Sequence, residues 1–549
     1  MAKFTKRPVQ HTNRIIPAAP PFKGLNDTQP IGAMAPEFAI IFDNLIAKPN
    51  GPTSRLGSRK HYTGFAAAVK SFIRYNGKVP ADSKFFAVSG GNIFDITATG
   101  EVGDDPALVT GLSTSNVWWQ FAQQTHTTAT HNYVIAVNGA NMPQLYNGAW
   151  SAATQTGSPS AAGEFKDVDN NGAAVDISKF KDVALHQQRL WFVLNNSSKG
   201  YYCDIAQVGG NLYAFDFGPF FPRGGNLHKI TAWTLDAGGD SGVQAILIAI
   251  SSNGDVVVFD GNNPADAGSW QYRGSYQLGS PVGQRCTEAF QGELLYLSKD
   301  GLFPLSKYLR SAGTDPTQAL TYNISNSISS LVNTFTNLEG FEVKSFAPQS
   351  ALVLNIPQQD SKLNFQYVMN TLTGGWGRFT GWAAHCFMEF NGQFYYGTDN
   401  AVVTAFSNFT DNADTDGTNG TAVVWRALQA FTDLSEADLG GAGKTVNGIK
   451  PYIETTNPTL SLAVGINVDF DTSLGSVTGV TLPTSSLALW DSATWDGATW
   501  YGGTTTFNQW FVPLSNPGIN IAVALVGSGN SQVTWAKTDW RLVAGLENG

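Results

Sequence analysis

Charged residues, cysteines and long apolar runs are all scarce in this sequence of 549 residues. Lys, Arg, Asp and Glu make up only 14% of the chain, which argues against long solvent-exposed helices. The three cysteines, Cys203, Cys286 and Cys386, lack the spacing of a metal site, and we expect buried free thiols. No apolar run reaches about 18 residues, and no apolar stretch follows the basic N-terminus. We therefore expect no membrane anchor, no secretory signal and synthesis in the cytoplasm.

Basic residues are too few overall for a general nucleic-acid-binding protein. The net charge is −9, and binding to phosphates requires a basic face. The distribution is uneven, because residues 1–60 hold nine Lys and Arg against three acidic residues, a local charge of +6. The remaining 24 basic and 39 acidic residues give −15. We interpret residues 1–60, which show few strand signals, as an extended basic arm that lies on neighbouring molecules.

Signatures of catalysis are also missing. The chain has no GxSxG, HExxH or CxxC pair, and its seven histidines are scattered. The AGKT stretch at 442–445 has Asp438 where a phosphate-binding loop requires its first glycine. A pair of catalytic carboxylates that only the fold brings together leaves no local motif, so this kind of active site stays an open alternative. With that exception the sequence predicts a protein that is not an enzyme and uses no cofactor and no metal.

Two acidic turns match the first half of a calcium-binding loop, in which alternate oxygens converge on the cation. They are Asp167, Asp169, Asn171 and Gly172, and Asn412, Asp414, Asp416 and Gly417. Both lack the closing Glu, and Ser178 holds that place in the first loop. Because Asx-rich turns satisfy their own backbone, we expect turns without a cation, and we keep both loops as candidates for lining a lumen.

What the sequence does have is glycine, with 58 residues, and aromatic side chains, at 12%. Segments rich in β-formers alternate with Asn-Gly or Asp-Gly pairs, which supply the positive backbone dihedrals of tight hairpin turns. Such pairs occur at 76–77, 138–139, 147–148, 253–254, 260–261, 300–301 and 391–392. The chain is therefore expected to be almost wholly β.

The hairpins fall into units that recur every 45 to 75 residues or so, somewhat looser than the about 40 to 50 residues of a propeller blade. We predict a β-propeller of about six blades over residues 61–415, because radial sheets leave only short, protected edges. An array of β-sandwiches is the alternative. The units lie near residues 82–97, 132–150, 189–206, 245–262, 290–307 and 365–406.

One segment has helical periodicity. Ile324, Ile328, Leu331 and Phe335 recur at helical spacing after Ser and Asn residues suited to an N-cap. We predict a single amphipathic helix near residues 321–336 that packs against the propeller, and docking of a partner is the alternative.

The chain changes character after residue 415. Apolar residues alternate with small or polar ones from Leu460 to Phe470, and again from Ile519 to Leu525. Residues 416–549 are therefore expected to form a separate C-terminal β-sandwich or platform domain. It contains Trp490, Trp495 and Trp500 at a five-residue period, which suits a structural role or, as an exposed aromatic platform, stacking on sugars or on a partner subunit.

A family resemblance adds to this picture. Residues 42–64, FDNLIAKPNGPTSRLGSRKHYTG, carry Asn44, Pro49, Gly51, Arg55 and Gly57 in an order similar to the N-terminal signature of tail nozzle or hub proteins of short-tailed bacteriophages. Residues 215–286 and the stretch NTLTGGWGRFTGW at 370–382 also resemble this family, so that the similarity covers most of 25–406.

The resemblance implies a virion protein, a β-propeller subunit of a homohexameric ring below the portal and adaptor. It implies further contacts with tail fibres or spikes, and a lumen that retains genomic double-stranded DNA and passes it during ejection. An acidic body suits such a lumen, since phosphate contacts would hinder sliding. A carbohydrate-binding or carbohydrate-active propeller is the rival hypothesis. Contacts with the adaptor or with neighbouring subunits are expected from Lys3, Lys6, Arg7, Arg14, Arg55 and Arg59.

Overall fold

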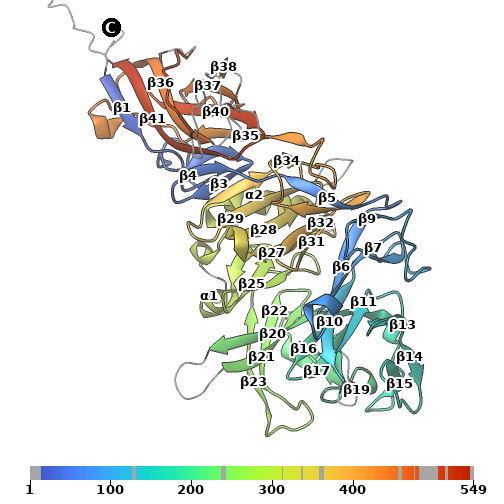
Figure 1. Cartoon of the computed structure of the whole chain (residues 1–549). Helices are drawn as coiled ribbons and strands as arrows, with labels where there is room; N and C mark the ends of the chain where they lie inside the picture. The colour runs from blue at the N-terminus through green and yellow to red at the C-terminus, as the bar shows by residue number, and fades with distance from the viewer. Residues whose placement is uncertain are drawn as a thin grey trace, which may run out of the picture.

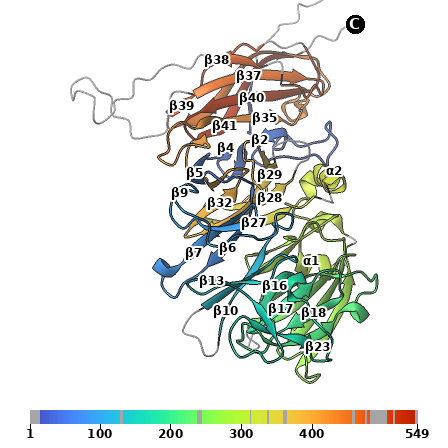
Figure 2. The same ribbon diagram turned by 90° about the vertical axis from the view of Figure 1, so that its right-hand side faces the viewer.

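Strands account for nearly all regular structure in the computed structural model of this chain, as the hairpin pattern predicts. The sheets form two bodies along the long axis of the molecule, a propeller and a smaller pair of packed sheets (Figures 1 and 2). None of the described helices is long and apolar enough to cross a membrane. The structure describes residues 14–126, 132–236, 243–311, 313, 315–335, 338–357, 364–455, 460–474, 477–480, 505–513 and 517–544.

The propeller consists of sheets of three or four antiparallel strands that follow one another along the chain. Blade 1 contains β6 (Val69–Tyr75), β7 (Lys84–Ser89) and β8 (Asn92–Asp95). Blade 2 contains β10 (Gln120–Thr125), β11 (Asn132–Val137), β12 (Gln144–Tyr146) and β13 (Trp150–Ala152). Blade 3 contains β16 (Phe180–His186), β17 (Arg189–Leu194), β18 (Lys199–Tyr202) and β19 (Gly210–Asp216). The short strands β14 (Thr154–Thr156) and β15 (Glu164–Asp169) extend blade 3 in parallel.

The later blades repeat this plan. Blade 4 contains β20 (Leu227–Asp236), β21 (Val243–Ser251), β22 (Asp255–Gly261) and β23 (Trp270–Gln277). Blade 5 contains β24 (Thr287–Phe290), β25 (Glu293–Ser298) and β26 (Gly301–Pro304). Blade 6 contains β27 (Glu342–Phe346), β28 (Ala351–Ile356), β29 (Phe365–Asn370) and β30 (Trp376–Phe379). Blade 7 contains β31 (Cys386–Phe390), β32 (Gln393–Gly397) and β33 (Ala401–Ala405), and β5 (Ser58–Thr63) is its outer strand.

The ring of blades is closed. The innermost strands β6, β10, β16 and β20 contact one another in turn, and so do β24, β27, β31 and β6. Blades 4 and 5 meet through β20 and β25. Closure is completed by β5, which comes from before blade 1 in the chain and pairs antiparallel with β33 of blade 7. The beginning and end of the propeller segment are thus hydrogen-bonded in one sheet, which closes the ring.

The described residues form seven blades, one more than the predicted number of about six. The segment 365–406, which the sequence suggests is one unit, supplies the end of blade 6 and most of blade 7. The last hairpin of blade 6 and the first hairpin of blade 7 follow each other so closely that their spacing in the sequence suggests one unit. The short strand β9 (Gly100–Glu101) pairs in parallel with β5 at the rim of blade 7.

Two packed sheets make up the second body, a β-sandwich. The first contains β1 (Arg14–Ala18), β3 (Leu45–Lys48), β4 (Gly51–Ser54), β36 (Lys444–Thr455), β39 (Thr505–Phe507) and β41 (Val533–Ala544). The second contains β2 (Ala39–Asp43), β35 (Thr421–Gln429), β37 (Leu460–Val468), β38 (Thr478–Val480) and β40 (Ile521–Gly529). Side chains of both sheets, such as Ile449 and Trp540 of the first and Leu462 and Val523 of the second, share one core. The alternation of apolar residues that begins at Leu460 thus corresponds to β37, whose apolar side chains lie in this core.

The prediction of an extended arm over residues 1–60 is wrong from residue 14 onward. β1 and β4 pair with β41, β3 pairs with β4, β2 pairs with β35, and β5 belongs to the propeller. Pairing satisfies backbone groups that an exposed arm would leave to water. Residues 1–13, which include Lys3, Lys6 and Arg7, lie outside the described residues.

The two bodies share a continuous sheet. β2 of the sandwich pairs in parallel with β30 of blade 6, where Asp43 lies opposite Arg378. The guanidinium of Arg378 donates two hydrogen bonds to the Asp43 carboxylate, at 2.7 and 2.8 Å. A bidentate pair of this kind fixes orientation as well as distance. The short strand β34 (Thr410–Asp411), which pairs with β35, carries the chain from blade 7 into the sandwich.

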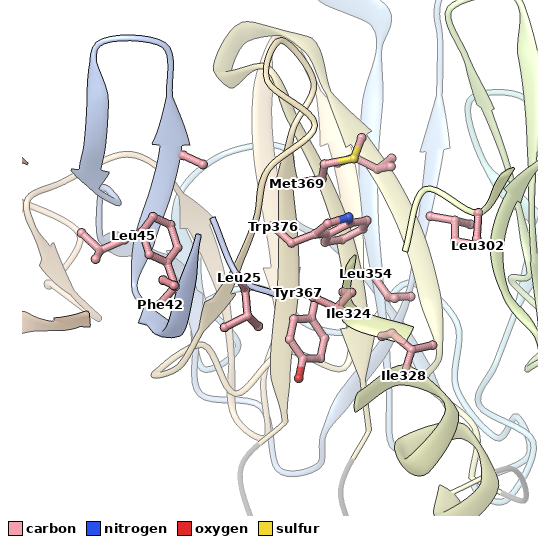
Figure 3. Close-up of a cluster of buried hydrophobic side chains, with 14 of the residues drawn as sticks. Leu25, Phe42, Leu45, Leu302, Ile324, Ile328, Leu354, Tyr367, Met369 and Trp376 are labelled. Atoms are coloured by element: carbon pink, nitrogen blue, oxygen red, sulfur yellow. The ribbon is translucent and has the colours of Figure 1, made fainter. Parts of the chain in front are cut away.

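A single hydrophobic cluster continues through the propeller and the sandwich. Figure 3 shows Leu25, Phe42 and Leu45 of the N-terminal segment beside Trp376 and Leu354 of blade 6. The helix α1 (Leu305–Arg310) follows blade 5 and buries Tyr308 in the same cluster.

The predicted helix is α2 (Ser325–Phe335), and it packs against this cluster through Ile328 and Val332, as expected. Its N-terminal amides do not depend on local Ser and Asn caps. The Asp27 carboxylate accepts hydrogen bonds from the backbone N–H groups of Asn326 and Ser327, at 3.2 and 2.8 Å. The N-terminal segment therefore caps a helix about 300 residues later in the chain.

Candidate functional site

Three residues that carry the family resemblance, Asn44, Arg55 and Gly57, meet at the junction between propeller and sandwich. The Arg55 side chain is fully buried there, and its guanidinium pairs with the Asp411 carboxylate at 2.7 and 2.5 Å. Its remaining N–H groups donate to Asn44 Oδ1 at 2.9 Å and to the carbonyls of Leu56 and Thr380. All five guanidinium N–H groups therefore have an acceptor. We call Arg55, Asp411, Asn44 and Trp382 the junction cluster.

The other members of the cluster hold this pair in place. The Trp382 indole N–H donates to Asp411 Oδ1 at 3.1 Å, and its ring lies 4.9 Å from the Arg55 guanidinium. Asn44 has a left-handed backbone, with φ of 55°, and its amide donates to Thr380 Oγ1 and to the Val424 carbonyl. The cluster thus ties the N-terminal segment, blade 6 and β35 together.

The signature glycines are required for close approach of the backbone. Gly57 lies against the Thr410 carbonyl, where an added Cβ would clash with backbone. Gly51 has φ of 124°, and a Cβ there would clash with the Trp535 carbonyl of β41. Within the motif at 42–64, Gly57 therefore serves the connection between the two domains, whereas Gly51 serves strand packing inside the sandwich.

Arg55, predicted as an adaptor or subunit contact, is a buried structural residue, because a fully covered guanidinium is not available to a partner. Arg14 is exposed on β1 at the edge of the sandwich, and Arg59 is half-buried on β5. Next to Arg59, the Lys60 ammonium contacts Asp414 Oδ1 at 3.1 Å. Arg14 and Arg59 stay predictions as contact residues.

The two acidic turns do not gather their carboxylates. Asp169 is buried and its Oδ1 accepts from the backbone N–H groups of Asn171 and Ala173, whereas Asp167 is exposed. In the second loop, Asp414 binds Lys60 and Asn419, and Asp416 accepts from Thr418. In the described ranges, no group of three or more His, Cys, Asp or Glu residues is placed to hold a metal ion. Trp490, Trp495 and Trp500 lie outside the described residues.

The centre of the propeller contains a polar cavity of about 400 Å³. It is lined by residues of all seven innermost strands, among them Phe72, Phe121, Leu185, Ile230 and Thr287. Its volume is in the range of small-molecule sites. The cavity is therefore the second candidate site of the molecule, and we call it the channel.

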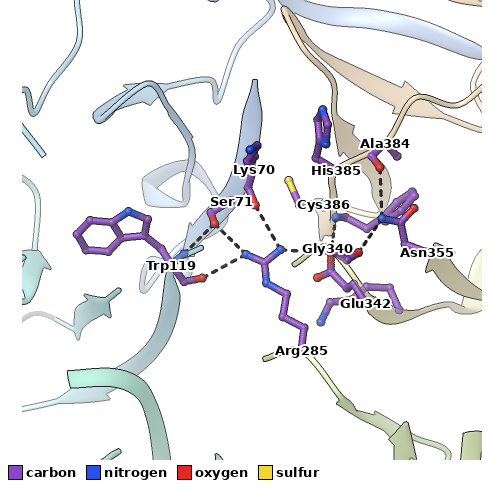
Figure 4. Close-up of polar contacts among 12 residues, drawn as sticks. Lys70, Ser71, Trp119, Arg285, Gly340, Glu342, Asn355, Ala384, His385 and Cys386 are labelled. Carbon is purple, nitrogen blue, oxygen red and sulfur yellow. Dashed lines mark hydrogen bonds and ion pairs between the residues drawn. The ribbon is translucent and has the colours of Figure 1, made fainter. Parts of the chain in front are cut away.

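Arg285 crosses the channel at one end (Figure 4). Its guanidinium lies 3.3 Å from Glu342 Oε2 of blade 6 and donates to Ser71 Oγ of blade 1 at 2.9 Å. It also donates to the Trp119 carbonyl, immediately before blade 2, at 3.2 Å. Glu342 Oε2 accepts a further hydrogen bond from the Phe387 N–H of blade 7. One arginine therefore connects blades on opposite sides of the ring.

Further charged side chains follow along the channel. The Lys229 ammonium lies 3.3 Å from Asp182, and that of Lys344 lies 3.0 Å from Glu288. Burial alone would lower the pKa of Lys344, but Glu288 and Glu342 hold it above its usual value. The Arg74 guanidinium donates to the Glu389 carbonyl at 3.1 Å, and within the described part of the chain no carboxylate lies within ion-pair distance of it.

Burial shifts the pKa values of two groups near the channel. Burial, then the nearby Lys181, lowers the pKa of His228 to about 4. Burial lowers the pKa of Lys181 as well. The predicted free thiols are buried, and burial raises the pKa of both Cys203 and Cys286 to about 12. Thiolate chemistry is disfavoured at these two positions.

Sequence reasoning did not find Asp411, Arg285 or the channel residues. The family resemblance is the one sequence signal near some of these residues, since Arg378 and Trp382 lie in the resembling stretch 370–382 and Arg285 lies in residues 215–286. Asp411 and Arg285 are hundreds of residues from several of their partners, so no local pattern marks them.

No family model matches the chain, and no curated protein matches it. Three solved structures show low similarity. The extracellular domain of a one-component system from B. thetaiotaomicron has 12% identity and a TM-score of 0.27 over 65% of this chain, which spans 40% of that protein's length. YCF48 bound to a D1 peptide has 9% identity and a TM-score of 0.26, covering 66% of this chain and 96% of that one. A protein described as a 6-phosphogluconolactonase from Bacteroides fragilis has 11% identity and a TM-score of 0.30, covering 67% and 91%. Such values support no functional inference, and the propeller assignment rests on the strand order of the chain itself.

Proposed function

We propose that this chain is a structural subunit of a short-tailed bacteriophage tail, a nozzle or hub protein that forms a homohexameric ring around the path of the DNA. The observation that carries the proposal is the role of the resembling residues. Asn44, Arg55 and Gly57 join two β domains into one body, and Gly51 lets β4 lie close to β41 within the sandwich. A signature that specifies architecture suits a protein whose task is assembly.

The size of the channel supports a DNA path between subunits and not through one propeller. A cavity of about 400 Å³ that Arg285 crosses is small for duplex DNA, whose major groove alone is about 12 Å wide. The acidic body, with −15 outside residues 1–60, suits a lumen in which DNA slides without strong phosphate contacts. The proposed role involves no turnover.

The proposed partners are other copies of the chain, the adaptor and portal, and tail fibres or spikes. The exposed Arg14 on β1 is a proposed contact, because it lies on the sandwich surface. The proposed location is the tail of the virion.

An early-stop allele in the phage that encodes the chain tests this role. Heads should package DNA and then lose it, because the ring that retains the genome is missing. DNA content per particle and electron micrographs of the tails measure the effect. Particles that lack the chain and still retain and eject DNA would contradict the proposal. Binding of purified chain to host surface glycans would favour the carbohydrate hypothesis instead.

A further inference from the structure

The channel presents more hydrogen-bond donors than acceptors to its interior. Arg74, Lys229, Arg285 and Lys344 line the cavity, and Glu342 is the one carboxylate among the described lining residues. A lysine ammonium has three N–H donors and an arginine guanidinium has five. Lys229 and Lys344 each contact one carboxylate, and Arg74 donates to one carbonyl. Most of the donors on these three side chains are therefore left for solvent or a ligand.

The carboxylates near the channel are directed toward the protein. Glu342 accepts from the Phe387 N–H, and Glu288 accepts from the Ser345 N–H and hydroxyl. Asp182 is 2% exposed behind Lys229. Three carboxylates thus face four lining cations. Lys181 beside Asp182 adds a fifth cation and Glu339 near Lys181 a fourth carboxylate, which leaves one positive charge in excess. The excess positive charge is local, since the chain as a whole carries −9.

We propose that the propeller channel binds a small oxyanion with phosphate or carboxylate groups, held by Arg74, Lys344 and Lys229. Such a ligand supplies acceptors for the unused donors. It also supplies a negative charge for Arg74, and a neutral sugar lacks that charge. A metal cation is disfavoured by the same charges. The cavity admits a small molecule only, so this site is separate from the DNA path of the proposed ring.

Titration calorimetry of the full chain with sodium pyrophosphate and with sodium citrate tests the site, with sodium chloride at equal ionic strength as the blank. We expect saturable binding of at least one of the two anions with one site per chain. Binding of pyrophosphate alone assigns a phosphate ligand, and binding of citrate alone assigns a carboxylate ligand. Absence of saturable heat from both anions at millimolar concentration would overturn the proposal.

Two variants localise the binding. Arg74→Gln should weaken it by about tenfold or more, because a charged hydrogen bond is lost. Lys307→Gln, an exposed change on α1, should leave it unchanged. Equal binding by wild type and Arg74→Gln would contradict the assignment.

Hydrogen exchange of the wild-type chain gives a readout that does not depend on the folding of a variant. The anion that binds should protect amides of β6, β20 and β27. Protection confined to other parts of the chain would place the anion elsewhere and overturn the proposal. A ring that fails to assemble would leave this result untouched, so the two proposals fail separately.

Discussion

The junction cluster and the channel are both built on arginines that reach distant parts of the chain, but they differ in how fully their hydrogen bonds are used. Arg55 is completely buried and all five of its N–H groups have protein acceptors. Arg74 is half-buried and donates to one carbonyl. A buried cation whose donors are all satisfied fixes structure, whereas a cation with unused donors in a cavity is available to a ligand. The difference separates the part of the molecule that joins the two domains from the part in which we propose a ligand site.

Loss of Arg55 should have the largest effect. Arg55→Met leaves the Asp411 carboxylate buried without its partner, and we expect a loss of about 3–5 kcal/mol in the free energy of unfolding. Urea unfolding measures it. The control Arg426→Met changes an exposed arginine on β35 and should cost less than about 0.5 kcal/mol. A loss below about 1 kcal/mol for Arg55→Met would show that the junction is not held by this pair.

Arg285 should combine both roles. Arg285→Met should lower the free energy of unfolding by about 2–4 kcal/mol, because Glu342 stays buried with only the Phe387 N–H as a donor. The same variant should weaken anion binding in the channel, whereas Arg55→Met should not. Calorimetry of both variants below their unfolding temperatures provides the comparison. Equal anion binding by Arg285→Met and wild type would show that Arg285 takes no part in the proposed ligand site.

The signature glycine at position 51 tests how closely the backbone packs beside the junction, where β4 lies against β41 of the sandwich. Gly51→Ala should lower the free energy of unfolding by about 2 kcal/mol, from positive φ and from the clash with the Trp535 carbonyl. Gly148→Ala is the matched control, because Gly148 has φ of 118° with nothing near an added Cβ. It should cost about 1 kcal/mol or less. Equal losses of unfolding free energy for Gly51→Ala and Gly148→Ala would show that the clash with the Trp535 carbonyl does not contribute.

The channel should respond to pH more than the junction does. The pKa of His228 is about 4 in the folded chain and about 6.5 when unfolded, so the unfolded state binds the proton first. The stability that His228 contributes is therefore complete above pH 6.5 and is lost as the pH falls toward 4. His228→Gln keeps a donor for the Gly283 carbonyl and should flatten this dependence by about 1 kcal/mol at this half-buried position. Urea unfolding at several pH values measures the effect. Equal slopes of the unfolding free energy against pH for the wild type and for His228→Gln would contradict this prediction.

The local part of the fold was predictable. Asn391 and Gly392 both have positive φ between β31 and β32, as a tight hairpin turn requires, and α2 lies where apolar spacing indicated a helix. The pair at 260–261 misled, because Gly261 lies within β22 opposite Trp270. Its glycine permits a backbone approach inside the sheet and not a turn.

The long-range part could not be read from the sequence. β5 closes the propeller across more than 330 residues, and Asp411 meets Arg55 across 356 residues. No periodicity or turn signal links such segments. The alternation of apolar and polar residues in a strand shows which face is buried, but it does not specify which distant strand is its partner. For the same reason the sequence predicts an arm over residues 1–60, where the structure has paired strands from residue 14 onward.

Assembly into a ring is the central claim, and native mass spectrometry of the full chain over a range of concentrations tests it most directly. We predict a species of six times the chain mass, whose share grows with concentration, and no change on addition of saccharides. A chain that stays monomeric at every concentration and binds saccharides would contradict the account.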